Sequence, residues 1–458
     1  MNGDPCVAQT SGETGLRLLD IAVCFFGFGF CVVAYYPGLL SPDSISMQSE
    51  ARDLSFTDWH STMMPLLWAA LYRLFPGPQG MLALLLAFYW GAVFLLAGAA
   101  AQIERRLASA MLITGFMPFT INFAGTLWSD VLTATSWLIC VALIFSAEIR
   151  GQPLSIIRKV ATWALFLIGG LARPNALFAA VPLGLYLWQS QRPPRSAKGA
   201  LIALLLLAGL WLGSWTISYP VLNAKKSYPI HSIVMFDLAG ISHFSGRNYL
   251  PLRWSAEETA KIVSSCYTPQ WWNEYAWGKC SFVWQRLRDE GLWGSADLWR
   301  AWFDAVKAQP LGYLRHRSAH FWYFITTAQD VFHEGDSATE VRRREEDNFG
   351  FKLLRDYVLG MSRLIVFRPI FWLALACGCL IAARSCAPAS RRFVTAVSLS
   401  SLVYLVTYFF VGVASDFRYA YWAVLGTSAC TVVLACEMAA VLTRPRRRLV
   451  HPSPQSSS

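Results

Sequence analysis

The sequence predicts an all-α integral membrane protein with about ten transmembrane helices, and three observations lead to this prediction. Hydrophobic residues make up 55% of the 458 residues, and charged residues make up only 15%. A soluble protein carries about 25% charged residues. The mean hydropathy is +0.39. Apolar runs of roughly 18 residues or more, each long enough to cross a hydrocarbon core about 30 Å thick, recur along the chain.

The first apolar run covers residues 16–36 and is longer than the core of a signal peptide. Pro37 and Gly38 follow it where a cleavage site needs small residues, so we expect a retained first helix. The fifth and sixth spans are expected to be separated at Arg173, because the residue before Pro174 disfavours α geometry. The predicted spans are residues 16–36, 80–101, 108–123, 131–148, 157–172, 174–189, 199–219, 364–383, 393–413 and 418–442.

The formal net charge of +11 is gathered in short gaps between apolar runs, such as Arg105 with Arg106 and Arg391 with Arg392. Alternate gaps hold little positive charge, which is the pattern that the positive-inside rule produces. The Arg-rich gaps and both termini are therefore expected on the cytoplasmic side of the cell (inner) membrane. The basic charge indicates orientation and contact with anionic lipid, and it does not indicate a nucleic-acid partner.

The predicted spans divide the chain into four parts. Residues 1–219 form an N-terminal transmembrane module that contains a first outer loop, residues 37–79. Residues 220–363 form an aromatic-rich outer segment, which is expected to be mainly helical and to rest on the membrane surface, because tryptophan favours the headgroup level. Residues 364–443 supply the last spanning helices, and residues 444–458 form a basic tail that is expected to be disordered.

Two shorter stretches outside the spans carry further expectations. Residues 63–75 are apolar but cover only about 20 Å as a helix, so an interfacial helix is expected there. Residues 295–325 have a helix-compatible spacing of apolar side chains. Cys266 and Cys280 can form one disulfide if the outer side is oxidising, and the sequence leaves that pairing open.

The first outer loop is acidic in a chain that is otherwise apolar. The stretch "SPDSISMQSEA" places Asp43 near the start of a short helix and Glu50 about two turns later. Asp58 and His60 follow in the same loop. Each has an ordinary structural explanation, with Asp43 as a helix N-cap and His60 as a hydrogen-bond partner of Asp58. A carboxylate held in a defined outward position can also do chemistry, so these four are candidate site residues.

Other outer gaps place polar side chains at the ends of predicted helices. Asp130 lies in "LWSDVL", Arg173 and Asn175 lie in "LARPN", and Arg418 and Tyr419 lie in "ASDFRYAYW". Ionisable residues at membrane depth are costly and usually mark a site. The alternative is that each arginine reaches a lipid headgroup or pairs with a neighbouring aspartate.

Carboxylates, arginines and a lipid-facing wall suit transfer from a sugar that is joined through phosphate to a polyprenyl lipid. Arginine can bind the phosphate through paired hydrogen bonds and stabilise the charge that develops on it. A carboxylate can take the proton of an acceptor hydroxyl as that oxygen attacks the anomeric carbon.

The same motifs resemble the multi-spanning class C glycosyltransferases, which include protein O-mannosyltransferases and the aminoarabinose transferase that acts on lipid A. The acidic first-loop motif and the "HPP"-like turn of that family are matched by "SPDSIS" and "HSTMMPLLWAALYRLF". Later motifs are matched by "IERRLASA", "WSDVLTA", "LARPNAL" and "DFRYAYWAVLG". The resemblance implies that Asp43 is the catalytic base, that Asp130 is a second acidic site residue and that Arg418 holds the donor phosphate, with Arg173 and Tyr419 beside it.

The implied activity is an inverting transfer from a polyprenyl-phosphate sugar to an envelope glycan, lipid or protein on the outer face. One carboxylate, Asp43, stands where the family has an acidic pair, so the family's metal ligands are not carried over. A divalent cation stays open, because Glu50, Asp58 and His60 offer mixed ligands without diagnostic spacing.

Other function classes also stay open. An envelope polysaccharide polymerase or ligase has a large late outer loop, as at residues 220–363, and depends on arginines such as Arg247. A transporter predicts internal symmetry and charges near the bilayer midplane, whereas the charges here lie at helix ends. Asp237, in "MFDLAGISHFSGRN", can line the acceptor side or pack the loop. The sequence does not determine the sugar, the acceptor or the oligomeric state.

Overall fold

The computed structural model describes residues 18–189, 196–335 and 346–443, and within these ranges every regular element is a helix. In the part of the chain that the structure describes, six helices are long and apolar enough to cross a membrane. The prediction of a helical membrane protein is confirmed at this level, while the predicted tail at 444–458 lies outside the described residues. The six are α1 (Leu18–Tyr35), α4 (Gln79–Ile103), α7 (Ser129–Ile149), α10 (Ser196–Thr216) with the π turn that follows it, α20 (Pro388–Val411) and α21 (Tyr421–Thr443).

Three further predicted spans are shorter helices of the same bundle. They are α8 (Ile156–Ala172), α9 (Ala176–Gln189) and α19 (Pro369–Ala382). A helix of 14 residues, the length of α9 and α19, covers about 21 Å. Arg173, between α8 and α9, is extended, with φ −141° and ψ 133°. The break that Pro174 predicts is therefore confirmed.

The prediction of one spanning helix at residues 108–123 is wrong. The chain forms α5 (Ala108–Thr114), a turn, and then the four-residue helix α6 (Pro118–Ile121). Met117 is extended, with φ −63° and ψ 143°, because the ring of Pro118 crowds α geometry at the preceding residue. The apolar pattern alone did not reveal this break.

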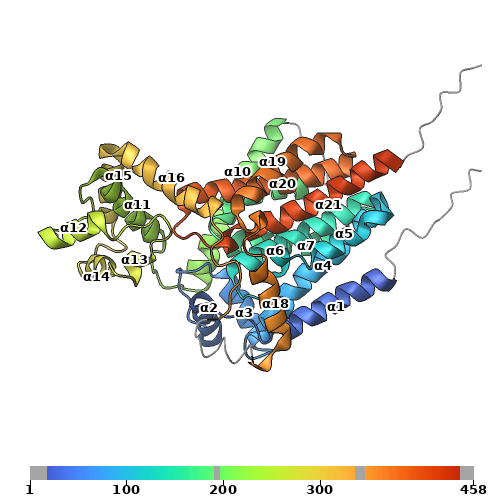
Figure 1. Cartoon of the computed structure of the whole chain (residues 1–458), viewed down its shortest axis with the longest axis horizontal. Coiled ribbons are helices and arrows are strands. Elements are labelled where there is room, and N and C mark those ends of the chain that lie inside the picture. Colours follow the sequence, from blue (N-terminus) through green and yellow to red (C-terminus); the bar gives the residue numbers. More distant parts are fainter. Residues whose placement is uncertain (1–17, 190–195, 336–345, 444–458) are drawn as a thin grey trace, which may run out of the picture.

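The first outer loop contains two short helices, α2 (Pro42–Asp53) and α3 (Met63–Tyr72). They lie at the end of the bundle away from the first turn of α1 and the last turn of α21 (Figure 1). Ser41 is the N-cap of α2, because its hydroxyl accepts from the backbone N–H of Ser44 at 3.3 Å. Pro42 occupies the first helical position, which suits its fixed φ. Asp43 is therefore in the first turn of α2 and is not its cap.

Residues 230–326 form a separate helical lobe beyond that end of the bundle, which we call the disulfide lobe (Figure 1). Its apolar core is distinct from that of the bundle. The stretch 295–325 divides at Gln309, just before Pro310, into two helices. The helices of the lobe are α11 (Ile230–Ser245), α12 (Ala256–Ser264), α13 (Asn273–Ala276), α14 (Phe282–Asp289), α15 (Ala296–Ala308) and α16 (Pro310–Thr326).

Beyond the lobe, α18 (Phe349–Gly360) packs against α1 of the bundle. The side-chain amide of Asn348 donates to the carbonyl of Val33 at 2.8 Å. Part of the predicted outer segment therefore belongs structurally to the bundle.

A disulfide joins Cys266 and Cys280, whose Cα atoms are 5.8 Å apart, and so settles the pairing that the sequence left open. Both cysteines are buried in the core of the lobe. The bond closes the connection between α12 and α14, which contains the single-turn helix α13.

Replacing both bridged cysteines with alanine should destabilise the disulfide lobe by about 2–4 kcal/mol, because the cross-link restricts the unfolded chain. Urea unfolding followed by tryptophan fluorescence would measure the loss. Cys377→Ala, at an exposed free cysteine, is the matched control and should leave the unfolding midpoint unchanged. An unchanged midpoint in the double variant would contradict the expectation.

Candidate functional site

Arg418 connects two aspartates at one end of the helix bundle. Its Nη1 atom donates to Oδ2 of Asp43 at 3.1 Å, and its Nε atom donates to Oδ2 of Asp416 at 3.1 Å. A third donor, Nη2, lies 2.9 Å from the hydroxyl of Tyr419. The guanidinium carbon is 4.5 Å from the ring centroid of Trp128, a cation–π distance. Arg418 is thus held in a fixed position with its charge paired.

Asp43 reaches Arg418 because the start of α2 is tied to the segment just before α7. The Ser44 hydroxyl donates to the carbonyl of Leu127 at 2.7 Å, and the indole N–H of Trp128 donates to the Ser41 hydroxyl at 2.7 Å. The Asp43 side chain keeps 38% of its surface exposed, whereas that of Arg418 keeps 13%. The carboxylate therefore faces both its partner and open space.

A second ion pair, between Arg173 and Asp130, lies beside the first. The Nε atom of Arg173 is 3.2 Å from Oδ1 of Asp130, in the first turn of α7. Both arginines lie close to the Tyr419 ring, whose centroid is 5.2 Å from the guanidinium carbon of Arg173 and 4.9 Å from that of Arg418. The break after α8 and the turn before α21 thus bring two cations to one place.

His60 completes this group, which we call the Arg418 cluster: Asp43, His60, Asp130, Arg173, Asp416, Arg418 and Tyr419. The Nε2 atom of His60 is 3.8 Å from Oδ1 of Asp43, too far for a hydrogen bond but close enough for an electrostatic contact. Residues from five separate parts of the sequence therefore meet at the end of the bundle that carries α2.

The other candidate residues are engaged in different contacts. Glu50 accepts a hydrogen bond from the Thr57 hydroxyl at 2.6 Å. Asp58 accepts from the Tyr219 hydroxyl at 2.9 Å and from the backbone N–H of Ser227, so it joins the first loop to the start of the outer segment. These two bonds, rather than one to His60, account for the position of Asp58.

Asn175 and Asp237 are both buried. Asn175 lies near the Tyr404 side chain of α20. Asp237 lies in the core of the disulfide lobe, where it pairs with Arg317 at 2.6 Å. Of the two readings that the sequence left open for Asp237, the structure favours packing of the lobe.

Residues 327–335, which we call the strap, cross the Arg418 cluster and were not expected there. The carbonyl of Gln329 accepts from the backbone N–H of Phe417 at 2.8 Å, and Asp330 lies close enough to Asp416 to raise its pKa. His333 lies against Trp128, with 5.1 Å between ring centroids, and bonds the carbonyl of Leu40 at 2.8 Å. The acidic and aromatic "AQDVFHEG" was the only sequence signal for this segment.

The environment shifts the pKa values of three groups in this region. Burial opposes ionisation of Asp43, but Arg418, His60 and Arg173 together lower its pKa, so it is a carboxylate at neutral pH. Burial lowers the pKa of His60 despite the nearby Asp43, which keeps the imidazole neutral at pH 7. Burial raises the pKa of Asp416 to about 6, and Asp330 adds to the rise against the opposing effect of Arg418.

Among the described residues, no group of three or more His, Cys, Asp or Glu side chains is arranged to hold a metal ion. Glu50, Asp58 and His60, the mixed ligand set considered from the sequence, do not converge. The cationic partners of Asp43, Asp130 and Asp416 are instead the two arginines.

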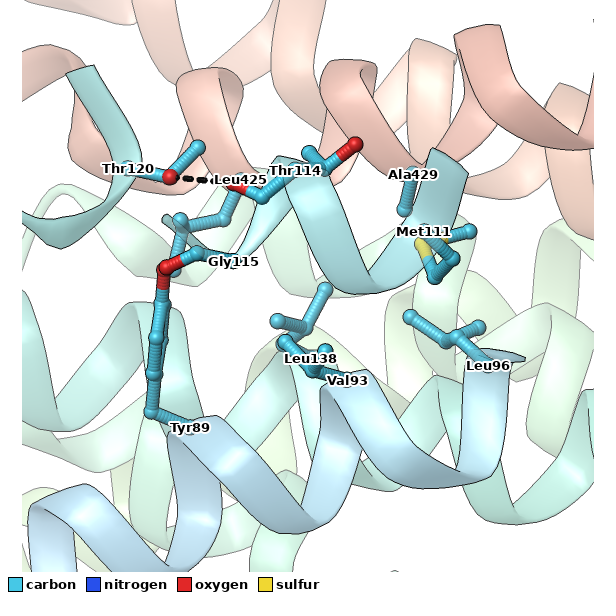
Figure 2. A pocket seen from close by; sticks show the side chains of 10 residues that line it. All are labelled: Tyr89, Val93, Leu96, Met111, Thr114, Gly115, Thr120, Leu138, Leu425 and Ala429. Atoms are coloured by element: carbon cyan, nitrogen blue, oxygen red, sulfur yellow. Dashed lines mark hydrogen bonds between the residues drawn. The ribbon is translucent and has the colours of Figure 1, made fainter. Parts of the chain in front are cut away.

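A small pocket inside the bundle lies apart from the Arg418 cluster (Figure 2). Aliphatic side chains line most of it, and the Tyr89 hydroxyl donates to the carbonyl of Gly115 at 2.7 Å. Figure 2 also shows the Thr120 hydroxyl bonded to the carbonyl of Thr114. These polar atoms are satisfied within the bundle, so the pocket offers no arrangement for catalysis.

Comparison with known protein families, curated proteins and solved structures gives no match. The function must therefore be argued from the geometry and charge of the Arg418 cluster itself.

The Asp330→Asn substitution should lower the pKa of Asp416 from about 6 toward its ordinary value, because it removes the neighbouring negative charge. Infrared absorption of protonated carboxyl groups between pH 4 and 8 would follow the titration, with Asp416→Asn to assign the band. Asp297→Asn, at an exposed pair with Arg300, is the control. A titration that stays near pH 6 in Asp330→Asn would contradict this account.

The same shift predicts how stability depends on pH. Between pH about 4 and about 6 the folded protein holds a proton on Asp416 that the unfolded chain has released, so this residue's contribution falls as the pH rises through that window. The fall should be smaller in Asp330→Asn when unfolding midpoints are compared across the window.

Proposed function

We propose that the protein is a membrane glycosyltransferase that takes a sugar from a polyprenyl-phosphate donor and transfers it to an envelope glycan, lipid or protein. The observation that carries the proposal is the partly exposed Asp43 carboxylate held 3.1 Å from Arg418 at the ends of membrane helices. A base for the acceptor and a cation for the leaving group thus stand side by side. The first-loop position of Asp43 also agrees with the resemblance to class C glycosyltransferases.

In this reaction Asp43 is the general base. Its lowered pKa keeps it ionised, and its exposed surface is open to an acceptor hydroxyl. The hydroxyl oxygen attacks the anomeric carbon, its proton passes to Asp43, and the bond from that carbon to the phosphate oxygen breaks with its electron pair leaving on the phosphate. Attack opposite the leaving group inverts the anomeric centre.

Arg418 and Arg173 would bind the donor phosphate. A guanidinium carries five N–H donors, and the contacts described above for Arg418 use three of them. The remaining donors and the second guanidinium can stabilise the charge that grows on the phosphate. Asp130 pairs with Arg173, and the Tyr419 ring contacts both cations. A divalent cation stays open as an additional partner.

The proposed membrane arrangement keeps ten crossings of the cell (inner) membrane with both termini in the cytoplasm. The segment 108–123 then crosses as a broken path instead of one helix. The Cys266–Cys280 disulfide supports an oxidising, non-cytoplasmic side for the disulfide lobe, because such bonds are rare in the cytosol. The Arg418 cluster lies at the same end of the bundle as the lobe, as a donor presented in the outer leaflet requires.

An envelope polysaccharide polymerase or ligase is the second candidate, favoured by the size of the lobe and the exposed Arg247. It requires activity that survives loss of Asp43 but not loss of Arg247. A transporter is less favoured, because the charged cluster lies at helix ends rather than near the middle of the bundle.

Asp43→Asn should lower the transfer rate about 10²–10⁴-fold, because an amide cannot take the acceptor proton. Donor binding should persist, since Arg418 and Arg173 remain. Sugar transfer from a short-chain prenyl-phosphate donor by the purified protein would measure the rate, and binding of the same donor would be measured alongside it. Asp53→Asn, at an exposed pair with Arg52 on the same helix, is the matched control. Full activity in Asp43→Asn would remove the proposed base.

Arg418→Lys should raise the KM for the donor more than it lowers kcat, because lysine keeps one charge but loses the planar fork that bridges Asp43, Asp416 and a phosphate. Steady-state kinetics over a range of donor concentrations would separate the two effects. Arg52→Lys is the control and should match the wild type. An unchanged KM in Arg418→Lys would assign the phosphate to other residues.

A further inference from the structure

Residues 412–416, the loop between α20 and Arg418, are held by α20 and by the disulfide lobe. From α20, the Tyr408 hydroxyl donates to the carbonyl of Ala414 at 2.7 Å. Trp272 donates its backbone N–H to the carbonyl of Val413 at 2.8 Å. The Ser415 hydroxyl donates to the carbonyl of Gln270 at 2.6 Å. Both lobe residues lie within the stretch that the Cys266–Cys280 bond closes. The backbone just before Arg418 is therefore fixed in part from outside the bundle.

Arg317 of α16 makes the deepest of these contacts. Its side chain is fully buried, and its Nη1 atom donates to the carbonyl of Gly412 at 2.7 Å. Its Nε atom lies 2.6 Å from Oδ1 of Asp237, and the indole of Trp302 donates to Oδ2 of the same carboxylate at 2.8 Å. One guanidinium thus joins the core of the lobe to the end of α20.

The space around the Cα atom of Gly412 is also filled, by His320 of α16 and Tyr408 of α20. A Cβ atom there would lie 2.6 Å from Nε2 of His320 and 2.6 Å from the carbonyl oxygen of Tyr408. No side chain fits at this position without moving the backbone. The Gly412 carbonyl is therefore confined between α16 and the last turn of α20.

Stability alone does not account for the buried Asp237–Arg317 pair. Removing two charges from water costs several kcal/mol per ion, and apolar residues of similar volume are often as stabilising. What an apolar pair cannot do is bind the Gly412 carbonyl. The guanidinium fork is suited to hold Asp237 and a backbone oxygen at once.

We infer that Arg317 is a positioning residue, which sets the place of Arg418 through the Gly412 carbonyl and the loop 412–416. The lobe is then part of the machinery that aligns the Arg418 cluster, in addition to any contact with an acceptor. The inference about loop position stands on the contacts above, and its consequence for the donor rests on the proposed function.

Hydrogen exchange measured by mass spectrometry on the full chain tests the loop position without a substrate. Arg317→Lys and the charge-free pair Asp237→Leu with Arg317→Met should each speed exchange in residues 412–420. Exchange in α14, which carries neither substituted residue, should stay as in the wild type for the charge-free pair. If the charge-free pair shows the same exchange in residues 412–420 as the wild type, Arg317 has only a structural role and the inference is overturned.

Two further variants serve as a second perturbation of this contact and as a control. Gly412→Ala crowds His320 of α16 and Tyr408 of α20 and leaves Arg317 intact, so it should also speed exchange in 412–420, even if the Arg317 variants fold poorly. Arg286→Lys, at the Arg286–Glu258 pair on the surface of the same lobe, is the matched control. Wild-type exchange in Gly412→Ala would contradict the inference.

Kinetics with a prenyl-phosphate sugar then test the consequence for the donor. The charge-free pair should raise the donor KM about 10–100-fold, the scale on which a displacement of about 1 Å affects a reacting group, with a smaller change in kcat. If the wild type neither binds nor uses the donor, the proposed function fails, while the exchange experiment still decides the positioning role. Faster exchange with an unchanged donor KM would overturn the link between Arg317 and the donor.

Discussion

The pairing of Arg418 with Asp43 and Asp416 is the interaction on which the arrangement of this end of the molecule depends. An arginine at the end of a membrane helix is costly unless its charge is compensated. Its two carboxylate partners come from α2 and from the loop after α20, and Trp128 covers the face of the guanidinium. Each of these segments must converge on Arg418, and the strap then closes over them through Gln329 and Asp330.

Breaks in the helices make this convergence possible. A continuous helix satisfies its own backbone groups and presents apolar side chains to lipid, so polar chemistry collects where helices end. Pro174 ends α8 at Arg173, and Gly412 ends α20 before the loop that carries Asp416. The freed backbone groups are taken up by other segments, as when the Gly412 carbonyl accepts from Arg317. The same breaks thus place the charges and bind the disulfide lobe to the bundle.

The sequence predicts those features that depend on local composition or on one residue. Apolar runs gave the membrane helices, and Pro174 gave the break at Arg173. The equivalent effect of Pro118 is not predicted by the apolar pattern, because apolar residues continue on both sides of it. The sequence also predicts the short loop helices and the charged residues at helix ends. It does not predict which carboxylate pairs with which arginine, because Asp43 and Arg418 are 375 positions apart and several carboxylates are available to each arginine. The strap had no periodic signal, so the place of Asp330 depends on tertiary contacts alone.

The charges of the Arg418 cluster limit how an anionic ligand can enter it. Two arginines face Asp43, Asp130 and Asp416, so the ionised cluster is already slightly negative before a phosphate arrives. A phosphate must therefore use the remaining guanidinium donors and compete with a carboxylate, or be accompanied by a proton. Asp416, whose pKa burial and the neighbouring Asp330 raise to about 6, takes up such a proton more readily than Asp43 does. Asp43, whose pKa is lowered, stays ionised through the same change. Under the proposed function this difference in pKa gives the two carboxylates different roles. Asp416 takes up a proton when the donor phosphate binds, and Asp43 stays ionised and accepts the proton of the acceptor hydroxyl.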